Sequence, residues 1–209
     1  MNNALKILDF MKIAEQLCLV ERDNLMSSGR QETDADHIFK LAFLVLMVQP
    51  YLKHQADYGK MLELALVHDL VEARSGDYSL SAQMADPSLR AQKKAKEREA
   101  ALYYQEVLPS PLNDKIYDLF MEYENRQSRE AKLVWALDKL EANLQANRFH
   151  DGDVRYWAEC ENGNIYYQMA VTKKPQIKDL DEEIISELEE AIIKLSEENI
   201  KKCNISLCR

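Results

Sequence analysis

The sequence predicts an all-α fold made of a single domain. Glycine and proline, which most often interrupt helices, occur only five times each among 209 residues. Apolar residues recur at helical spacing along most of the chain. No stretch alternates apolar and polar residues convincingly over the length of a strand. The chain is long enough for one domain with a substantial core, and short for two.

Local signals indicate where the helices begin and end. Thr33, followed three residues later by Asp36, resembles a capping box with Asp in place of Glu. Pro50 ends the apolar helix that follows, and residues 24–30 are expected to be a loop. The expected helices are residues 3–20, about 34–49, 58–73, 87–108, a fifth that begins at Pro111, 128–147 and 181–199.

The domain is expected to contain a motif-bearing core and a helical extension. The core covers about residues 5–145 and the extension about residues 155–200, with a break at Asp151-Gly152-Asp153 between them. The helix at 87–108 is expected to expose a basic, solvated face. The residues of that face are Lys93, Lys94, Lys96 and Arg98.

Charge and composition exclude several classes of protein. A net charge of −9 disfavours binding to DNA or RNA polymers, whereas a divalent metal and a few Arg or Lys could still bind a small phosphate ester. The most apolar run, residues 41–48, is too short to span a membrane. The sequence has no secretory signal and no CxxC spacing among its four cysteines. We therefore expect a cytoplasmic protein with free thiols.

The pair His68-Asp69 is the first candidate for a chemical site. It lies inside residues 61–71, an otherwise apolar predicted helix, where an ionised Asp is costly unless something pairs with it. A divalent cation would be an adequate partner, and Glu72 lies one turn after His68 on the same helix face. The alternative is a buried His-Asp pair without a metal, because a lone His-Asp dipeptide is a weak motif.

Three further residues are candidates for the same chemical site. His37 lies one turn inside a capped apolar helix, Asp138 is a carboxylate within the apolar residues 135–144, and Asp77 follows a helix end. Each could also have an ordinary role. His37 could be a histidine at a helix start, Asp138 could form an ion pair with Lys139 or a nearby Arg, and Asp77 could be a turn residue. Two imidazoles and two carboxylates suit Mn²⁺, Co²⁺, Fe²⁺, Ni²⁺ or Zn²⁺ better than Ca²⁺ or Mg²⁺.

The order His…His-Asp…Asp and its local sequence resemble a known family. Residues 30–37 (RQETDADH), 67–77 (VHDLVEARSGD) and 136–141 (ALDKLE) are similar to motifs of the HD-domain phosphohydrolase superfamily. The resemblance is to the branch that contains the bacterial 5′-deoxynucleotidases and their eukaryotic relatives. It implies an HD-type helical bundle, a homodimer, a nucleotide or other phosphate ester as partner, and one divalent metal. The metal ligands that it implies are His37, His68, Asp69 and Asp138.

The same resemblance implies roles for residues around the metal. Glu72 would assist the attacking water, as a carboxylate base can. Asp77 would help to position the substrate; an ionised Asp only accepts hydrogen bonds, so it suits a sugar hydroxyl. Arg22 matches the family's phosphate-binding Arg and Arg30 is a second candidate, although both could be solvated surface residues. Asp23 stands where nucleotidase members often have a Trp that contacts the nucleotide.

The expected function is hydrolysis of a nucleoside 5′-monophosphate, chiefly a deoxynucleotide, to nucleoside and phosphate. One alternative is an HD-type hydrolase of another ester, such as a nucleoside triphosphate, a cyclic nucleotide or an alarmone. The single HD motif and the small size of the chain disfavour it. The other alternative is a metal-stabilised regulatory module without turnover, which the presence of Glu72 and Asp77 disfavours. Tyr123 could line a base pocket, but an aromatic residue on a helix is more often part of the core.

Overall fold

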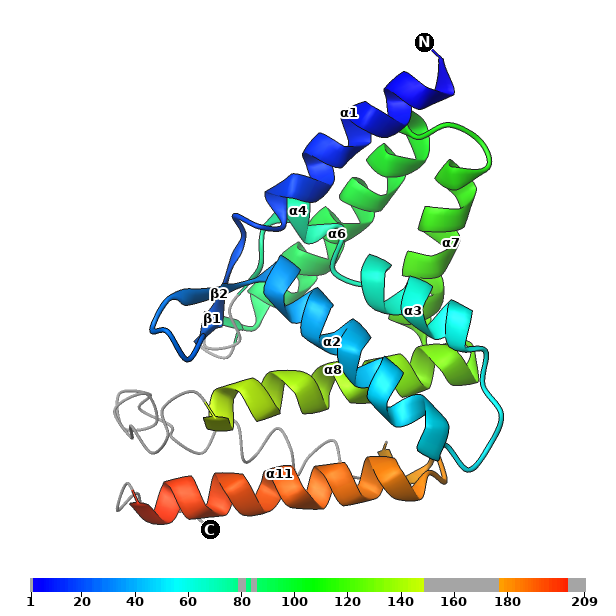
Figure 1. Ribbon diagram of the computed structural model, residues 1–209. Coiled ribbons are helices and arrows are strands. Elements are labelled where there is room, and N and C mark those ends of the chain that lie inside the picture. The colour runs from blue at the N-terminus through cyan, green and yellow to red at the C-terminus, as the bar shows by residue number, and fades with distance from the viewer. Residues whose placement is uncertain (1, 79–81, 84–85, 149–176, 203–209) are drawn as a thin grey trace.

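The computed structural model describes residues 2–78, 82–83, 86–148 and 177–202. Helices dominate the described chain, as predicted, and one small antiparallel sheet accompanies them (Figure 1). The elements are α1 (Asn3–Gln16), β1 (Glu21–Leu25), β2 (Gln31–Thr33), α2 (Asp34–Val48), the 3₁₀ turn η1 (Gln49–Tyr51), α3 (Tyr58–Val67), α4 (Glu72–Ser75), α6 (Ser88–Val107), α7 (Leu112–Asn125), α8 (Arg129–Arg148) and α11 (Glu183–Lys202).

Helix α8 lies at the centre of the packing. It contacts α2, α3, α7 and α11, and Figure 1 shows α2 crossing it while α11 runs alongside it. Leu133 and Leu137 of α8 are fully buried, and they share one apolar core with Leu41 of α2 and Leu64 of α3. Close packing on several sides fixes the position of α8 and of the polar side chains that it carries.

The β1–β2 hairpin was not predicted. Glu21 pairs with Thr33 and Leu25 pairs with Gln31 in an antiparallel register. These strands are too short and too polar to show a clear alternation of apolar and polar residues. The prediction of a loop holds only for the connection between them, where Gly29 adopts a positive φ of 83°. The hairpin brings β1 beside the start of α2.

The predicted continuous helix over residues 58–73 is wrong at residues 68–71. Helix α3 ends at Val67, residues 68–71 form turns, and α4 covers only Glu72–Ser75. The turns are closed by short-range bonds, from Leu70 N to Val67 O (3.0 Å) and from Glu72 N to Asp69 O (2.9 Å). The His-Asp pair therefore lies at a helix end: His68 is the C-cap of α3 and still has an αR backbone, and the turns after it are closed by i to i−3 bonds.

Helix α11 confirms the last predicted helix, and it is fastened by a buried carboxylate. Glu182, fully buried just before α11, accepts hydrogen bonds from Lys53 N (2.6 Å) and His54 N (3.1 Å) and pairs with Arg129 of α8. These bonds tie α11 to α8 and to the loop before α3. The predicted break at residues 151–153 and the first part of the predicted extension lie outside the described residues.

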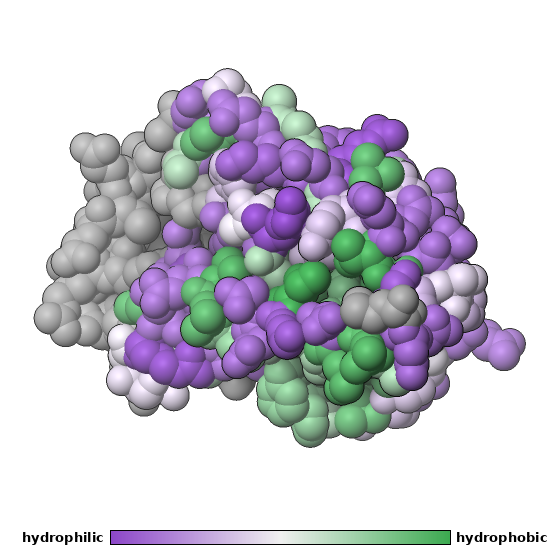
Figure 2. Space-filling view, turned by 90° about the horizontal axis from the view of Figure 1, so that it is seen from above, coloured by the Kyte–Doolittle hydropathy of each residue, from purple (hydrophilic) through white to green (hydrophobic). Residues whose placement is uncertain are grey.

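Some large apolar side chains remain at the surface. Figure 2, seen from above the view of Figure 1, shows hydrophobic residues grouped among hydrophilic ones on that face. The exposed apolar residues of α1 and α2 include Leu5, Leu8, Met11, Phe39, Phe43 and Met47. No helix among the described residues is both long and apolar enough to cross a membrane.

Candidate metal centre

His37 is held in the first turn of α2 by its neighbours. Thr33 Oγ1 accepts a bond from Asp36 N (3.3 Å) and the Asp36 carboxylate accepts one from Thr33 N (2.9 Å), so the predicted capping box is present. The His37 ring is completely buried. Its Nδ1 lies 2.5 Å from Glu141 Oε2 of α8. A carboxylate at this position accepts a hydrogen bond from Nδ1–H. The lone pair of the neutral ring is then on Nε2.

His68 is oriented in the same way by a backbone carbonyl. Its Nδ1 lies 2.9 Å from the carbonyl oxygen of Ala65, which can only accept a hydrogen bond. The neutral ring therefore carries its proton on Nδ1 and presents the lone pair of Nε2. The two Nε2 atoms of His37 and His68 lie 3.4 Å apart, so both free lone pairs are directed to one small region.

Two carboxylates complete this group. Asp69 Oδ2 lies 3.1 Å from His68 Nε2 and 3.8 Å from His37 Nε2, and Asp138 Oδ1 lies 3.2 Å from His37 Nε2. The other oxygen of Asp138 accepts a bond from the hydroxyl of Tyr123 (2.5 Å) and pairs with Lys139 Nζ (2.6 Å). The fold thus brings together all four residues that were predicted to be metal ligands.

The donor set fits a divalent transition metal. Two imidazole nitrogens and two carboxylate oxygens are ligands that such ions accept, and each imidazole has the outer hydrogen bond typical of a metal-bound histidine. Nitrogen atoms of His37 and His68 and an oxygen of Asp69 lie within 4.8 Å of one another. A cation between the two Nε2 atoms, which lie 3.4 Å apart, would bind both imidazoles in their neutral form.

The charges at the centre stabilise its carboxylates in the ionised form. Burial alone would raise the pKa of Asp69, but the neighbouring His68 and Arg22 hold it well below its usual range. Burial would likewise raise the pKa of Asp138, yet Lys139 and the two histidines hold it low. Without a metal, burial and Arg22 oppose a charge on His37, but Asp138 and Glu141 raise its pKa to about 9. A metal that binds Nε2 of His37 would therefore replace a proton on that atom.

Arg22, the residue that the resemblance assigns to phosphate binding, reaches the centre from β1. Its Nη1 lies 3.1 Å from Asp69 Oδ2 and 3.2 Å from Asp34 Oδ1, and its side chain is only 15% exposed. Burial tends to lower the pKa of Arg22, but the charges around it, with Asp69 the largest, raise it well above its usual value. Arg30 is placed differently: it is half exposed and makes two hydrogen bonds to the carboxylate of Asp36 (2.7 and 2.8 Å).

Glu72 and Asp77 share a lysine that was predicted to lie on a solvated face. Lys93 Nζ lies 2.7 Å from Glu72 Oε1, 3.6 Å from Asp77 Oδ1 and 3.4 Å from Glu97 Oε1. The prediction for Lys93 is therefore wrong, whereas Lys94, Lys96 and Arg98 are exposed as predicted. Burial, reinforced by the charge of Asp69, raises the pKa of Glu72 well above its usual value, and the charge of Lys93 opposes that shift.

Three contributors to the centre were not predicted from the sequence. Glu141 lies one helical turn after Asp138, and that spacing could have indicated that both face the same neighbour. Tyr123, expected in the core, is buried but also donates to Asp138. Asp34 is fully buried beside Arg22; its position in the first turn of a helix made an ordinary N-terminal carboxylate the natural interpretation.

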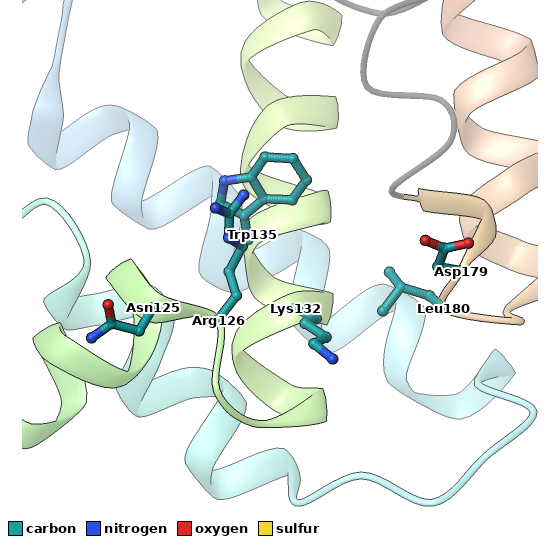
Figure 3. Close-up of a pocket in the computed structure, with 6 residues that line it drawn as sticks. All are labelled: Asn125, Arg126, Lys132, Trp135, Asp179 and Leu180. Atoms are coloured by element: carbon teal, nitrogen blue, oxygen red, sulfur yellow. The ribbon is translucent and has the colours of Figure 1, made fainter. Parts of the chain in front are cut away.

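A separate hollow lies away from these residues. It measures about 380 Å³ and opens between α7, α8 and residues 179–180 (Figure 3). In Figure 3 the guanidinium of Arg126 lies over the indole of Trp135, and its Cζ is 5.0 Å from the ring centre. The six lining residues are Asn125, Arg126, Lys132, Trp135, Asp179 and Leu180. Because no predicted site residue lines it, this hollow is not assigned to the metal centre.

Comparisons with known proteins agree with this geometry. A family model described as HD domain matches residues 14–191. The 5′-deoxynucleotidase HDDC2 of Danio rerio is 33% identical over 147 residues, which cover 69% of this chain and 70% of that protein. The protein of the same name from Homo sapiens is 31% identical over 152 residues, covering 72% and 71%.

Solved structures share the fold. A protein from Magnetospirillum magnetotacticum, described as a predicted metal-dependent phosphohydrolase, superposes with a TM-score of 0.76 over 96% of both chains at 23% identity. A conserved hypothetical protein from Pyrococcus furiosus superposes with a TM-score of 0.64 at 28% identity, covering 88% of this chain and 99% of that one. These likenesses confirm the predicted all-helical architecture.

Proposed function

The chain belongs to the HD-domain family, and from this premise we propose that it hydrolyses deoxynucleoside 5′-monophosphates to nucleoside and phosphate, using a divalent transition metal. The observation that carries the proposal is the convergence of His37, His68, Asp69 and Asp138 with their free donor atoms directed to one region. The names of the relatives support the substrate class, because those proteins are 5′-deoxynucleotidases.

A metal held by those four residues would supply a Lewis acid for the phosphoryl group and lower the pKa of a bound water. The candidate ions are Mn²⁺, Co²⁺, Fe²⁺, Ni²⁺ and Zn²⁺. Asp69→Ala should abolish this binding, because it removes the carboxylate that lies closest to His68. Elemental analysis after chelation and reloading with Co²⁺ checks this. Unchanged cobalt content in the variant would contradict the proposed ligand set.

The surrounding residues have separable roles in the proposed reaction. Glu72 accepts a proton from the attacking water and is oriented by Lys93, its partner at 2.7 Å. Arg22 binds the phosphate, since its guanidinium lies beside Asp69, one of the proposed metal ligands. Asp77, 3.6 Å from Lys93, accepts a hydrogen bond from a sugar hydroxyl. Arg30 is a weaker candidate for phosphate binding because it is half exposed and pairs with Asp36, which is not one of the proposed metal ligands.

The charges favour a monophosphate over a triphosphate. Arg22 and Lys93 are the cations that the structure places beside Asp69, Glu72 and Asp77, and carboxylates already pair with both. A triphosphate would need a longer track of positive charge. The other lysines of α6, Lys94 and Lys96, are exposed. A homodimer remains part of the proposal on the strength of the resemblance, and a cytoplasmic location on the strength of the cysteine pattern.

Phosphate release from a panel of esters tests the function. We expect the Co²⁺- or Mn²⁺-loaded protein to release phosphate from deoxynucleoside monophosphates, and to act far more slowly on ribonucleotides and triphosphates. Arg22→Ala should raise KM if its contact is equal in the ground and transition states, and lower kcat if the contact tightens during phosphoryl transfer. Arg98→Ala is a matched control, because Arg98 is exposed on α6. Tripolyphosphate released from a triphosphate, with monophosphates inert, would overturn the proposal.

A further inference from the structure

Carboxylates hold Arg22 at two different atoms of its guanidinium. Asp34 and Asp69 both contact Nη1, the end that reaches the metal centre, at 3.2 and 3.1 Å. Glu32 lies at the base of the group, with its Oε2 3.4 Å from Arg22 Nε. We propose that Glu32 is a positioning residue for phosphate binding, which fixes the Arg22 guanidinium through Nε and leaves its Nη atoms to the phosphate. This role of Glu32 rests on the proposed function, in which Arg22 binds the phosphate.

The contact between Glu32 and Arg22 is buried. The side chain of Glu32 on β2 is 0% exposed and that of Arg22 on β1 is 15% exposed. At 3.4 Å the contact is an ion pair, and neither Arg22 Nε nor Glu32 Oε2 has a hydrogen-bond partner among the described residues. Buried polar atoms without partners are costly, and a small rotation would turn this ion pair into a hydrogen bond. The two groups are therefore expected to stay together when a ligand binds at Nη1.

The chemistry of arginine makes Nε an effective place for such a restraint. The guanidinium is planar and rigid, and its five N–H groups have fixed directions. A contact at Nε therefore also determines where the Nη atoms point. A phosphate that pairs with Nη1 competes with Asp34 and Asp69 for that atom, whereas the contact between Nε and Glu32 stays in place.

Glu32 is itself held by Lys40 of α2. The other oxygen of Glu32, Oε1, accepts a hydrogen bond from Lys40 Nζ. The same ammonium lies 2.9 Å from Glu141 Oε1 and donates to Gln145 Oε1 at 2.8 Å, and both of these residues are on α8. An ammonium has three protons, and these three acceptors use all of them. Lys40 therefore anchors Glu32 to α8 and has no proton left for a substrate.

The backbone of Arg22 is anchored as well. Its carbonyl oxygen accepts a hydrogen bond from the side-chain amide of Gln31 on β2. Gln145 of α8 donates a hydrogen bond to the carbonyl of Leu25 at the end of β1 (2.6 Å). An arginine that is fixed before the ligand arrives loses less conformational entropy on binding than a mobile one. The contacts of Glu32 and of the strand thus prepare Arg22 for phosphate.

The charge of Glu32 alone would have the opposite effect on phosphate. An anion beside the phosphate site repels a phosphate, so Glu32→Gln would strengthen phosphate binding if Glu32 acted only through its charge. If Glu32 positions Arg22, its neutral replacement holds the guanidinium less strongly and phosphate binding becomes weaker. Because the two effects have opposite signs, the direction of the change distinguishes them.

Binding of inorganic phosphate to the full chain, saturated with Co²⁺ and followed by calorimetry, tests the proposal. We expect the Kd for phosphate to be about 10-fold weaker in Glu32→Gln than in the wild type. In the Arg22→Ala background the same change should have an effect of less than about twofold, because Glu32 acts through Arg22. Glu21→Gln is the matched control: it makes the same change of charge at the exposed start of β1 and should leave the Kd unchanged.

Unchanged or tighter phosphate binding in Glu32→Gln, or an equal loss with and without Arg22, would overturn the positioning role, and phosphate release from monophosphates would leave the proposed function intact. The expected binding pattern without hydrolysis would have the opposite meaning. Should Glu32→Gln fail to fold, as judged by circular dichroism, Arg22→Lys decides, because lysine keeps the charge but lacks the planar group that Glu32 holds. It should bind phosphate about 10-fold or more weakly than the wild type, and wild-type affinity there would overturn the proposal.

Discussion

Replacing Glu141 tests whether His37 is held in position for a metal. The carboxylate of Glu141 lies 2.5 Å from His37 Nδ1 and 2.9 Å from Lys40 Nζ. Burial would raise its pKa, but His37 and Lys40 lower it, so Glu141 accepts the Nδ1 proton as an anion. It does not lie among the atoms that would touch the metal. Its effect on binding therefore acts through the orientation and basicity of His37.

The size of the effect depends on what replaces the carboxylate. Loss of such an outer partner typically lowers metal affinity 10- to 100-fold. Glu141→Gln keeps an acceptor oxygen but loses the charge that makes the bond strong, so we expect about a 10-fold weaker Kd, or about 1.4 kcal/mol. Glu141→Ala removes the acceptor as well, and we expect about a 100-fold weaker Kd, or about 2.7 kcal/mol.

Competition with a chromogenic chelator measures the Kd for Co²⁺ directly. Glu63→Gln is the matched control, since Glu63 lies on α3 in a surface ion pair with Lys115 and should leave the Kd unchanged. Circular dichroism confirms that each variant is folded. Wild-type affinity in both Glu141 variants, with Asp69→Ala unable to bind, would refute the role given to Glu141.

Three further predictions concern catalysis, the helix cap and pH. Glu72→Ala should retain the transition metal but lose about 100-fold or more in kcat; wild-type turnover in the folded, loaded variant would refute the assignment as base. Thr33→Ala should lower the free energy of unfolding by about 1 kcal/mol, measured with urea, because it removes half of the capping box; an unchanged midpoint would contradict this. Burial raises the pKa of Glu97 from 4.5 to about 7, against the opposing charge of Lys93. The folded state then binds this proton more tightly than the unfolded state, so stability from this group falls as pH rises through that window. Glu97→Gln should gain in melting temperature relative to wild type between about pH 5 and about pH 7.5, and an equal difference at both pH values would refute the shift.

The candidate metal ligands could be identified in the sequence because they contrast with their surroundings. A histidine or carboxylate such as His68 or Asp138 stands out within an apolar helix, and its burial then has to be compensated. The helices were predictable for a related reason: a 3.6-residue apolar period over ten or more residues is a strong local signal. Both inferences use information that lies within one segment of the chain.

The remaining features depend on contacts between segments, which local sequence does not encode. Residues 58–73 contain no Pro and only one Gly, at position 59, so helix propensity gave no reason to expect turns after Val67; tertiary packing overrides propensity there. Lys93 looks like Lys94 and Lys96 in the sequence, and only the approach of α4 to α6 distinguishes it. The hairpin likewise depends on the pairing of two very short strands.

Glu182 makes the docking of α11 accessible to hydrogen exchange. The amides of Lys53 and His54 lie in the loop before α3, and their hydrogen bonds run to the carboxylate of Glu182. Their exchange with solvent deuterium can proceed only when that carboxylate withdraws, so the rate at these two amides reports how often α11 separates from the helices that carry the candidate metal ligands. Comparison with amides in the middle of α8 would show whether the C-terminal helix opens alone or only when the whole chain unfolds.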